Sequence, residues 1–220
     1  MGDERSQARC RGLLLTVFLV LAVACNSITP QPAATSTATA SSPQGAPTSS
    51  TGSTPVTLAL VSIPNADMQY YDIVGSTEDE LRAELNAKGP VGYDGQRGDA
   101  TTWWSIRWTW PGQGTFFCTL NAPTVTYQIT VVFPRWNAPS NAAPPLISKW
   151  NNYEQALGEH EKGHVDFVVA HYPAVSAAIE GATCSTAEAA AQNALQPIRQ
   201  HDIDYDAQTN HGATQGAHFP

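Results

Sequence analysis

The chain has 220 residues, a length that suits one ordinary domain and is short for two. Hydrophobic residues make up 42% of it, which is enough for a packed core, and charged residues make up only 14%. The net charge is −8, and an acidic chain of this kind offers no electrostatic footprint for nucleic acid, so we expect no nucleic-acid partner.

The first 25 residues have the pattern of an export signal. Three arginines lie within the first eleven residues, and an apolar run over 12–24 follows that is too short to span a bilayer well. The small and apolar residues before Cys25 resemble the bacterial lipobox, in which the cysteine is acylated and becomes the mature N-terminus. We therefore expect export and a lipid on Cys25 that anchors the protein to the outer face of the bacterial cell membrane or to the cell surface. The alternative is a plain signal peptide cleaved after Ala22-Val23-Ala24.

Residues 26–55 read as a linker. They are almost all Ser, Thr, Ala, Pro, Gly and Gln, with no aromatic and no charged residue, so they cannot bury enough apolar surface to fold. A flexible coil of about 30 residues would average roughly 30 Å from end to end. The linker would tether a single domain over 56–220 to the membrane.

The first half of this domain is rich in strand signals. A strand is predicted over 69–74, and a capping-box signal at Ser76-Thr77 then opens a helix that Gly89-Pro90 stops after Lys88. Apolar and polar residues alternate over 104–110 and over 125–133, which predicts two half-buried antiparallel strands. At this spacing the tryptophans are expected in the core, although a ligand platform is the alternative.

The second half is predicted to be helical. From Pro145 onward apolar residues recur every three or four positions, so a helix follows that Pro173 kinks or restarts, and Gly181 ends the region. A further helix over 185–205 is disturbed at Pro197. The order of elements predicts an α+β fold, with an antiparallel β-meander packed on the long helix and on a second, C-terminal helix.

The cysteines divide by position. Cys10 leaves with the signal and Cys25 is the lipid site, so Cys118 and Cys184 remain in the folded domain. An oxidising compartment favours a disulfide between them, closing a loop of about 65 residues and contributing on the order of 4 kcal/mol. Two buried free thiols are the alternative, whereas a zinc site without C-x-x-C spacing is not expected.

The strongest chemical signal is His160-Glu161-Lys162-Gly163-His164, an H-E-x-x-H sequence inside the predicted helix. Two histidines four residues apart lie on one helix face, so both imidazoles can reach one metal ion, and neutral imidazole suits Zn²⁺. Glu161 lies beside a metal-bound water without being a ligand, which suits a general base. The alternative is a surface helix with incidental histidines.

A catalytic zinc needs a third protein ligand. His171 is about 10 Å further along the same helix, too far unless the helix breaks, and is expected to be structural. Residues 201–212 are unusually rich in ligand types, although a solvated acidic C-terminus is the alternative. His211 is the first choice for the third ligand and Asp206 the second. An acidic ligand on a following helix, as in the aspzincins and gluzincins, favours Asp206 or Asp202.

The same residues carry a family resemblance. The H-E-x-G-H-x-D run over 160–166, followed by the run 205–212, resembles a bacterial family described as predicted secreted zinc-dependent proteases, first catalogued as a domain of unknown function. The similarity covers nearly all of residues 70–218. It also includes several upstream features: Tyr71 to Gly75, Glu80-Leu81-Arg82, Lys88-Gly89-Pro90, Thr102-Trp103, Cys118, Pro134-Arg135-Trp136 and Trp150.

The resemblance implies a zincin-like metallopeptidase fold with Zn²⁺ as cofactor. By position it implies that His160, Glu161 and His164 are site residues, and that His211 with Asp206 forms the second motif. It also implies that Cys118 and Cys184 are paired.

The sequence thus predicts hydrolysis of a peptide or protein substrate, with cell-envelope peptides among the candidates, by a zinc-activated water. Tyr205 or His201 would steady the oxyanion, and an edge strand of the tryptophan-rich sheet would bind substrate backbone. The rival hypothesis is a non-catalytic surface lipoprotein with a structural metal, binding envelope glycan or protein. A zinc amidase or endopeptidase of cell-wall peptides shares the chemistry and differs only in substrate.

Overall fold

A computed structural model describes residues 60–93 and 95–220. The predicted signal peptide, the lipid site at Cys25 and the linker over 26–55 lie outside the described residues. The described residues pack around one core, which is drawn from residues between Leu60 and Phe219. Among the described helices, none combines the length and apolar character that crossing a bilayer requires.

A three-stranded mixed sheet forms the base of the fold, in the order β1-β3-β2. The strands are β1 (Ala66–Ile73), β2 (Thr101–Thr109) and β3 (Thr124–Trp136). The antiparallel pairing predicted for the two alternating segments is confirmed for β2 and β3. The meander is wrong for the sheet as a whole, because β1 pairs parallel with β3. After β1 the chain crosses to the far side of the sheet and forms β2, and β3 then pairs with both strands in the centre. The alternation of apolar and polar residues does not reveal this order of strands.

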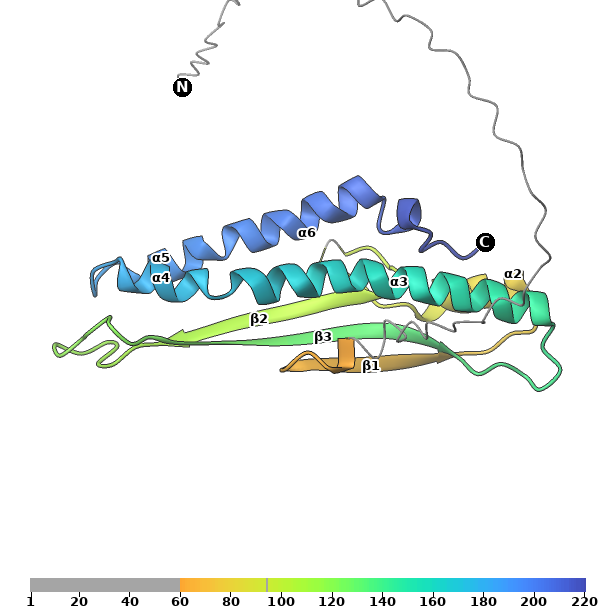
Figure 1. The fold of residues 1–220 in the computed structure, drawn as a ribbon, viewed down its shortest axis with the longest axis horizontal. Helices are drawn as coiled ribbons and strands as arrows, with labels where there is room; N and C mark the ends of the chain where they lie inside the picture. Colours follow the sequence, from red (N-terminus) through yellow and green to blue (C-terminus); the bar gives the residue numbers. More distant parts are fainter. Residues whose placement is uncertain (1–59, 94) are drawn as a thin grey trace, which may run out of the picture. The chain divides into compact units, whose positions relative to one another are not determined.

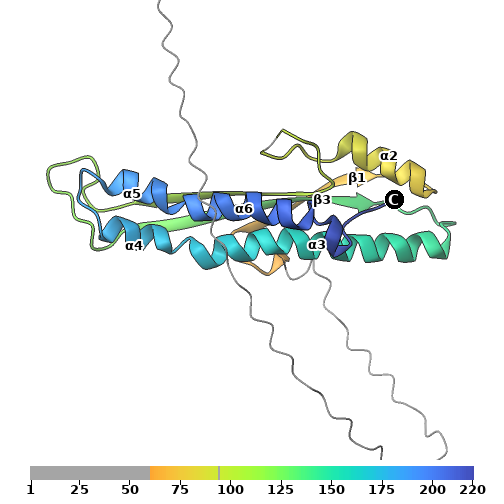
Figure 2. The same cartoon turned by 90° about the horizontal axis from the view of Figure 1, so that it is seen from above.

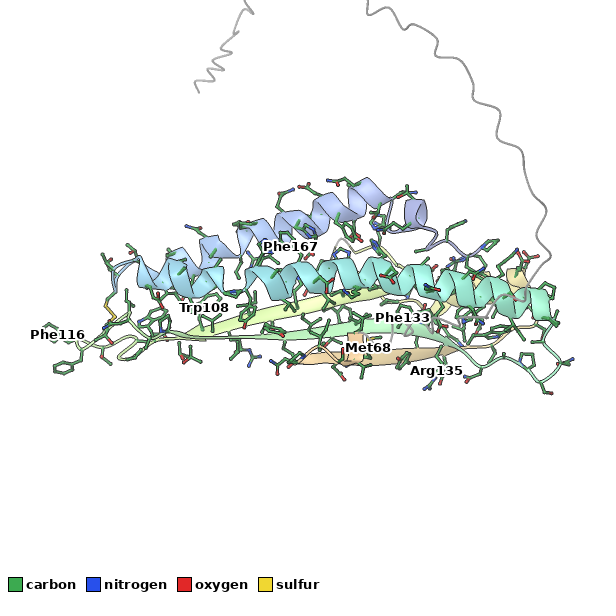
Figure 3. The ribbon with its side chains drawn as sticks, in the orientation of Figure 1. Met68, Trp108, Phe116, Phe133, Arg135 and Phe167 are labelled. Atoms are coloured by element: carbon green, nitrogen blue, oxygen red, sulfur yellow. A yellow bond between two sulfur atoms is a disulfide. The ribbon has the colours of Figure 1, made fainter. Side chains whose placement is uncertain are left out.

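The alternation along β2 and β3 matches burial on one face. Ile129, Val131 and Phe133 of β3 are fully buried, and Figure 3 shows Phe133 between the sheet and the long helix above it. On β2, Ile106 is buried, and Trp104 and Trp108 are half-buried against the core; Trp110, just after β2, is buried. These tryptophans therefore pack in or against the core, as predicted.

Helix α2 (Glu78–Lys88) follows the predicted capping signals and ends where Gly89-Pro90 predicted. The Thr77 side chain accepts a hydrogen bond from the Glu80 amide, and the Glu80 carboxylate accepts one from the Ser76 amide. Arg82 of α2 forms an ion pair with Asp99, just before β2, and the Tyr153 hydroxyl donates to the same carboxylate at 2.9 Å. This network fixes the start of β2, the edge strand of the sheet.

Five helical segments complete the fold: α3 (Pro144–His171), α4 (Ala174–Glu180), α5 (Ala187–Ala194), α6 (Gln196–Thr209) and the 3₁₀ turn η1 (Ala213–Gln215). Pro173 separates α3 from α4, and Pro197 lies in the first turn of α6, so both prolines act at the predicted places. Figures 1 and 2 show α3 and α6 running side by side in opposite directions on the same side of the sheet.

Helices α3 and α6 approach closely because of a glycine. A Cβ atom at Gly163 would lie 2.4 Å from the hydroxyl oxygen of Tyr205 on α6, closer than such atoms approach. The missing side chain therefore allows the Tyr205 ring to lie against the α3 backbone. Glycine costs the helix about 1 kcal/mol relative to alanine, which close packing must offset here.

The far end of the domain is cross-linked. Cys118, in the β2–β3 connection, forms a disulfide with Cys184, in the α4–α5 turn, which confirms the predicted pair. The sequence separation of 66 residues makes this a long closed loop, and a disulfide is typical of compartments outside the reducing cytoplasm.

Replacing both cysteines (Cys118→Ala with Cys184→Ala) should lower the free energy of unfolding by about 4 kcal/mol, because the unfolded chain gains the entropy of an open loop. Chemical denaturation with and without reductant measures this. The double variant should not respond to reductant, and an unchanged stability would contradict a stabilising cross-link.

The substitution Gly163→Ala should lower the free energy of unfolding by about 1–3 kcal/mol, because the added methyl overlaps Tyr205 and this outweighs the gain in helix propensity. Denaturant unfolding of a double-mutant cycle with Tyr205→Ala provides the control. In the Tyr205→Ala background the same change should be neutral or stabilising, and a stabilising effect with Tyr205 present would refute the close contact.

Candidate metal centre

Three of the predicted site residues lie together on one face of α3. His160, Glu161 and His164 are 3%, 3% and 6% exposed, so their polar groups need partners inside the protein. Helix α6 supplies the partners of the two histidines from Asp202 and Asp206, which lie four residues apart on the helix face toward α3. The i, i+4 spacing on each helix therefore brings two imidazoles against two carboxylates.

The side chains of His160, His164 and Asp206 converge on one point and form a group that could hold a metal ion. One carboxylate oxygen of Asp206, Oδ1, lies 3.2 Å from Nε2 of His160 and 3.1 Å from Nε2 of His164. Zinc bonds of about 2.0–2.1 Å in a tetrahedron imply ligand atoms roughly 3.3 Å apart. The two separations from Asp206 are close to this spacing, and all three ligand atoms lie within 4.8 Å of one another.

The outer ring nitrogens show which tautomers this arrangement selects. Nδ1 of His164 lies 3.0 Å from Oδ1 of Asp202, and Nδ1 of His160 lies 3.0 Å from Oε1 of Gln215. Each Nδ1–H donates to an oxygen, so each neutral ring directs the lone pair of its Nε2 toward the Asp206 oxygen. The lone pairs of the two Nε2 atoms and of the Asp206 oxygen would repel one another if nothing lay between them. The site therefore requires positive charge at its centre, from a proton or a metal cation.

The pKa values follow the same electrostatics. Burial lowers the pKa of His164, but the hydrogen bonds to Asp202 and Asp206 raise it more, so it reaches about 10. Burial raises the pKa of Asp206, while the hydrogen bonds to His160 and His164 lower it more, so the net pKa is below its ordinary value. A metal ion at this position would displace protons, so its binding should weaken as the pH falls.

Several further contacts fix the orientation of the ligands. The indole Nε1 of Trp104 donates to Asp202 at 2.7 Å, so the edge strand β2 holds the carboxylate that orients His164. The Tyr205 ring stacks on His160 with centroids 5.0 Å apart, and Gln215 donates to the Tyr205 hydroxyl at 3.0 Å. Such outer contacts are typical of metal-binding histidines.

A glycine beyond α6 makes room for His160. Gly212 has a φ of +78°, and a Cβ atom there would lie 2.8 Å from Cγ of His160. This turn leads into η1, which carries Gln215 to the His160 ring. The end of the chain therefore closes over the metal group.

Glu161 lies beside the metal group without belonging to it. Its Oε2 accepts a hydrogen bond of 2.6 Å from the hydroxyl of Thr102 on the edge strand β2. Burial raises the pKa of Glu161, against the opposing effects of His164 and the Thr102 hydrogen bond. A buried carboxylate with a raised pKa next to a metal group is suited to accepting a proton.

The site opens into a cleft of about 620 Å³. Its walls come from α3, α6, the turn around His211 and the segment from Gly98 to Thr102 that leads into β2. A shallower groove of about 320 Å³, lined by Trp103 among others, shares Tyr93 with the cleft. This groove lies across β2 and β3, where Trp103 pairs with Thr130, and Tyr93 lies between it and the cleft.

The structure brings Asp206, the second choice for the third ligand, into the metal group. His211 lines the cleft but is 68% exposed in its side chain, with Nδ1 3.8 Å from Oδ2 of Asp206. Asp202, also considered as a ligand, instead contacts the opposite nitrogen of His164. The ligand role of His211 stays a prediction.

The other predicted positions lie further out. His201 stacks on Phe167 with centroids 3.6 Å apart, and neither His201 nor Tyr205 is among the residues that line the cleft. The His171 ring also stacks on the Phe167 ring, with centroids 3.7 Å apart, and its Nδ1 donates to the Phe167 carbonyl. These contacts give His171 a structural role, as predicted.

Sequence reasoning missed three residues of the site: Thr102, Trp104 and Gln215. Thr102 lies 59 positions from its partner Glu161, and Trp104 lies 98 positions from Asp202. The phase of β2 was one available signal, since residues 102 and 104 share the face that points toward α3, and Thr102-Trp103 is also part of the family resemblance. Gln215 lies in a tail of small and polar residues with no pattern of its own.

Comparison with known proteins identifies the family without a function. Residues 68–212 match the family model described as "Bacterial protein of unknown function (DUF922)". No curated protein and no solved structure matches the chain. The matched segment contains the complete metal group, and because it spans well over half of the chain, the protein belongs to the bacterial DUF922 family.

Proposed function

We propose that this protein is a zinc-dependent peptidase that hydrolyses peptide bonds in its cleft. The observation that supports this is the convergence of His160, His164 and Asp206 on one point, with the non-ligating carboxylate of Glu161 beside it. Two nitrogens and one carboxylate oxygen are a ligand set that suits catalytic zinc.

The residues divide the chemistry among themselves. Bound Zn²⁺ would lower the pKa of a coordinated water and polarise the scissile carbonyl. Glu161 takes the proton of the attacking water and passes it to the leaving amine, and Thr102 keeps its carboxylate oriented. Asp202 and Gln215 hold the two imidazoles in the tautomer that offers Nε2.

A structural metal site is the rival proposal, and the ligand count argues against it. Structural zinc is normally enclosed by four protein ligands, whereas catalytic zinc has three and an open position. The described group supplies three, and the cleft borders it. The binding-module alternative, with envelope glycan or protein as partner, therefore has less support than hydrolysis.

The cleft also suggests how a substrate lies. The free edge of β2 begins at the metal group, so an extended peptide could pair with it while its scissile bond faces Glu161. Because Tyr205 and His201 do not line the cleft, the proposed oxyanion contact passes to His211 in the cleft wall. Peptides of the cell envelope are proposed as substrates because export and a lipid on Cys25 would place the enzyme there.

The metal assignment can be tested by substitution on α6. The wild-type protein should hold about one zinc ion per chain, and Asp206→Ala should weaken zinc affinity at least about tenfold, since it removes a direct ligand. His211→Ala should retain zinc. Metal analysis after dialysis against a graded chelator measures both, and Asp204→Ala, an exposed acid on the same helix, is the control. Loss of zinc in His211→Ala with retention in Asp206→Ala would reverse the assignment.

The role of Glu161 can be tested separately from metal binding. Glu161→Gln should retain zinc yet lower kcat by about 100-fold or more, because the amide cannot accept the proton of the attacking water. A screen of peptide libraries and cell-wall peptides, with zinc content measured in parallel, provides the readout. Glu159→Gln, an exposed change on the same helix, is the matched control. Undiminished hydrolysis by Glu161→Gln would remove Glu161 from this role.

A further inference from the structure

The tip of the β2–β3 connection exposes two adjacent phenylalanines. Phe116 is 96% exposed and Phe117 is 82% exposed, more than any other large hydrophobic residue in the described part of the chain. Their rings meet edge to face with centroids 5.6 Å apart. Figure 3 shows Phe116 projecting beyond the ends of the strands. Such exposure is unfavourable in water and points to a binding role.

The loop holds these rings outward by its own structure. The Gln113 amide bonds to the Trp110 carbonyl, and the Thr119 amide bonds to the Pro111 carbonyl at 2.9 Å. Gly112 has a φ of +69°, and a Cβ atom there would lie 2.4 Å from the Phe117 carbonyl oxygen. The disulfide of Cys118 ties the next residue to the α4–α5 turn. The two rings are therefore presented on a fixed, protruding support.

The tip is also free of charge. No Asp, Glu, Lys, Arg or His occurs from Trp108 to Pro134, in a chain of net charge −8. When the two rings enter an apolar medium, no charged side chain of this segment has to lose its hydration. The sequence around the phenylalanines is otherwise small or polar: Gly112, Gln113, Gly114 and Thr115.

We propose that the Phe116-Phe117 tip inserts into the interfacial region of a lipid bilayer. Two rings on a protruding loop bury too little area for a stable protein–protein interface, which needs about 1,200 Å² or more. A bilayer accepts an apolar tip without shape complementarity. An N-terminal apolar run ending at Cys25 lies on the same chain and is expected to place the domain at such a surface.

The position of the tip determines how far the metal group would lie from the bilayer. Strand β2 leads from Thr102 at the cleft to the loop that starts at Trp110, a separation of eight residues or about 26 Å. With β2 along the bilayer normal, insertion of the tip, which extends beyond Trp110, would hold the metal group at least about 25 Å from the bilayer surface. The bilayer contact does not depend on the proposed peptidase activity.

The first test uses the full chain in phosphatidylcholine vesicles whose acyl chains carry bromine, a short-range quencher of tryptophan fluorescence. Phe117→Trp adds a reporter at the tip, and Val74→Trp adds one at another exposed apolar position, 57% exposed. The emission added by Phe117→Trp should fall by roughly half or more in brominated vesicles, and that added by Val74→Trp should not. Equal quenching of the two reporters would overturn the proposal.

The second test removes the lipid anchor and uses residues 50–220, which contain the whole described core. The double substitution Phe116→Ser with Phe117→Ser should lower the vesicle partition coefficient about tenfold or more, while Val74→Ser leaves it unchanged. Because the tip is uncharged, added salt should not weaken this binding. Vesicle binding that persists in the double variant, or that salt abolishes, would contradict insertion of the tip. Zinc content and circular dichroism confirm that each variant is folded.

Discussion

The site depends on one carboxylate oxygen. Oδ1 of Asp206 lies within 3.2 Å of Nε2 on both His160 and His164, and the outer contacts of the rings direct lone pairs to the same point. This arrangement is stable only with positive charge at its centre, so the protein has gathered the ligands at a cost that a bound cation would offset. A proton on His164 or a bound cation can supply this charge, and the raised pKa of His164 shows how strongly the two carboxylates favour it.

Bringing Asp206 to that distance constrains the packing of two helices. Gly163 lets α6 approach α3, and Gly212 lets the following turn pass the His160 ring. Both glycines lower helix or chain stability by themselves, yet each lies where a side chain would displace a ligand or its neighbour. The sheet adds a third constraint, since Thr102 and Trp104 of β2 bind Glu161 and Asp202 respectively. The metal group is therefore held by α3, α6 and β2 together.

The sequence predicted local structure better than contacts between residues far apart in the chain. The helix around His160, the break at Pro173 and the Thr77 cap follow from spacing and backbone chemistry within a few residues. The parallel pairing of β1 with β3 depends on how a long connection crosses the sheet, which alternation does not encode. The choice between Asp206 and His211 depends on the phase at the end of α6. Asp206 still lies inside the helix and faces α3, whereas His211 follows the left-handed residue Asn210 and turns toward solvent.

The disulfide and the cleft lie at opposite ends of β2. Cys118 fixes the loop after β2, while the ion pair of Arg82 with Asp99 fixes the segment before it. These two contacts restrain the segments at either end of β2, between the loop and the metal group. The edge of β2 can align an extended substrate with Glu161 while the loop engages a different surface. The loop and the metal group therefore lie at opposite ends of one strand, so each can contact a different surface.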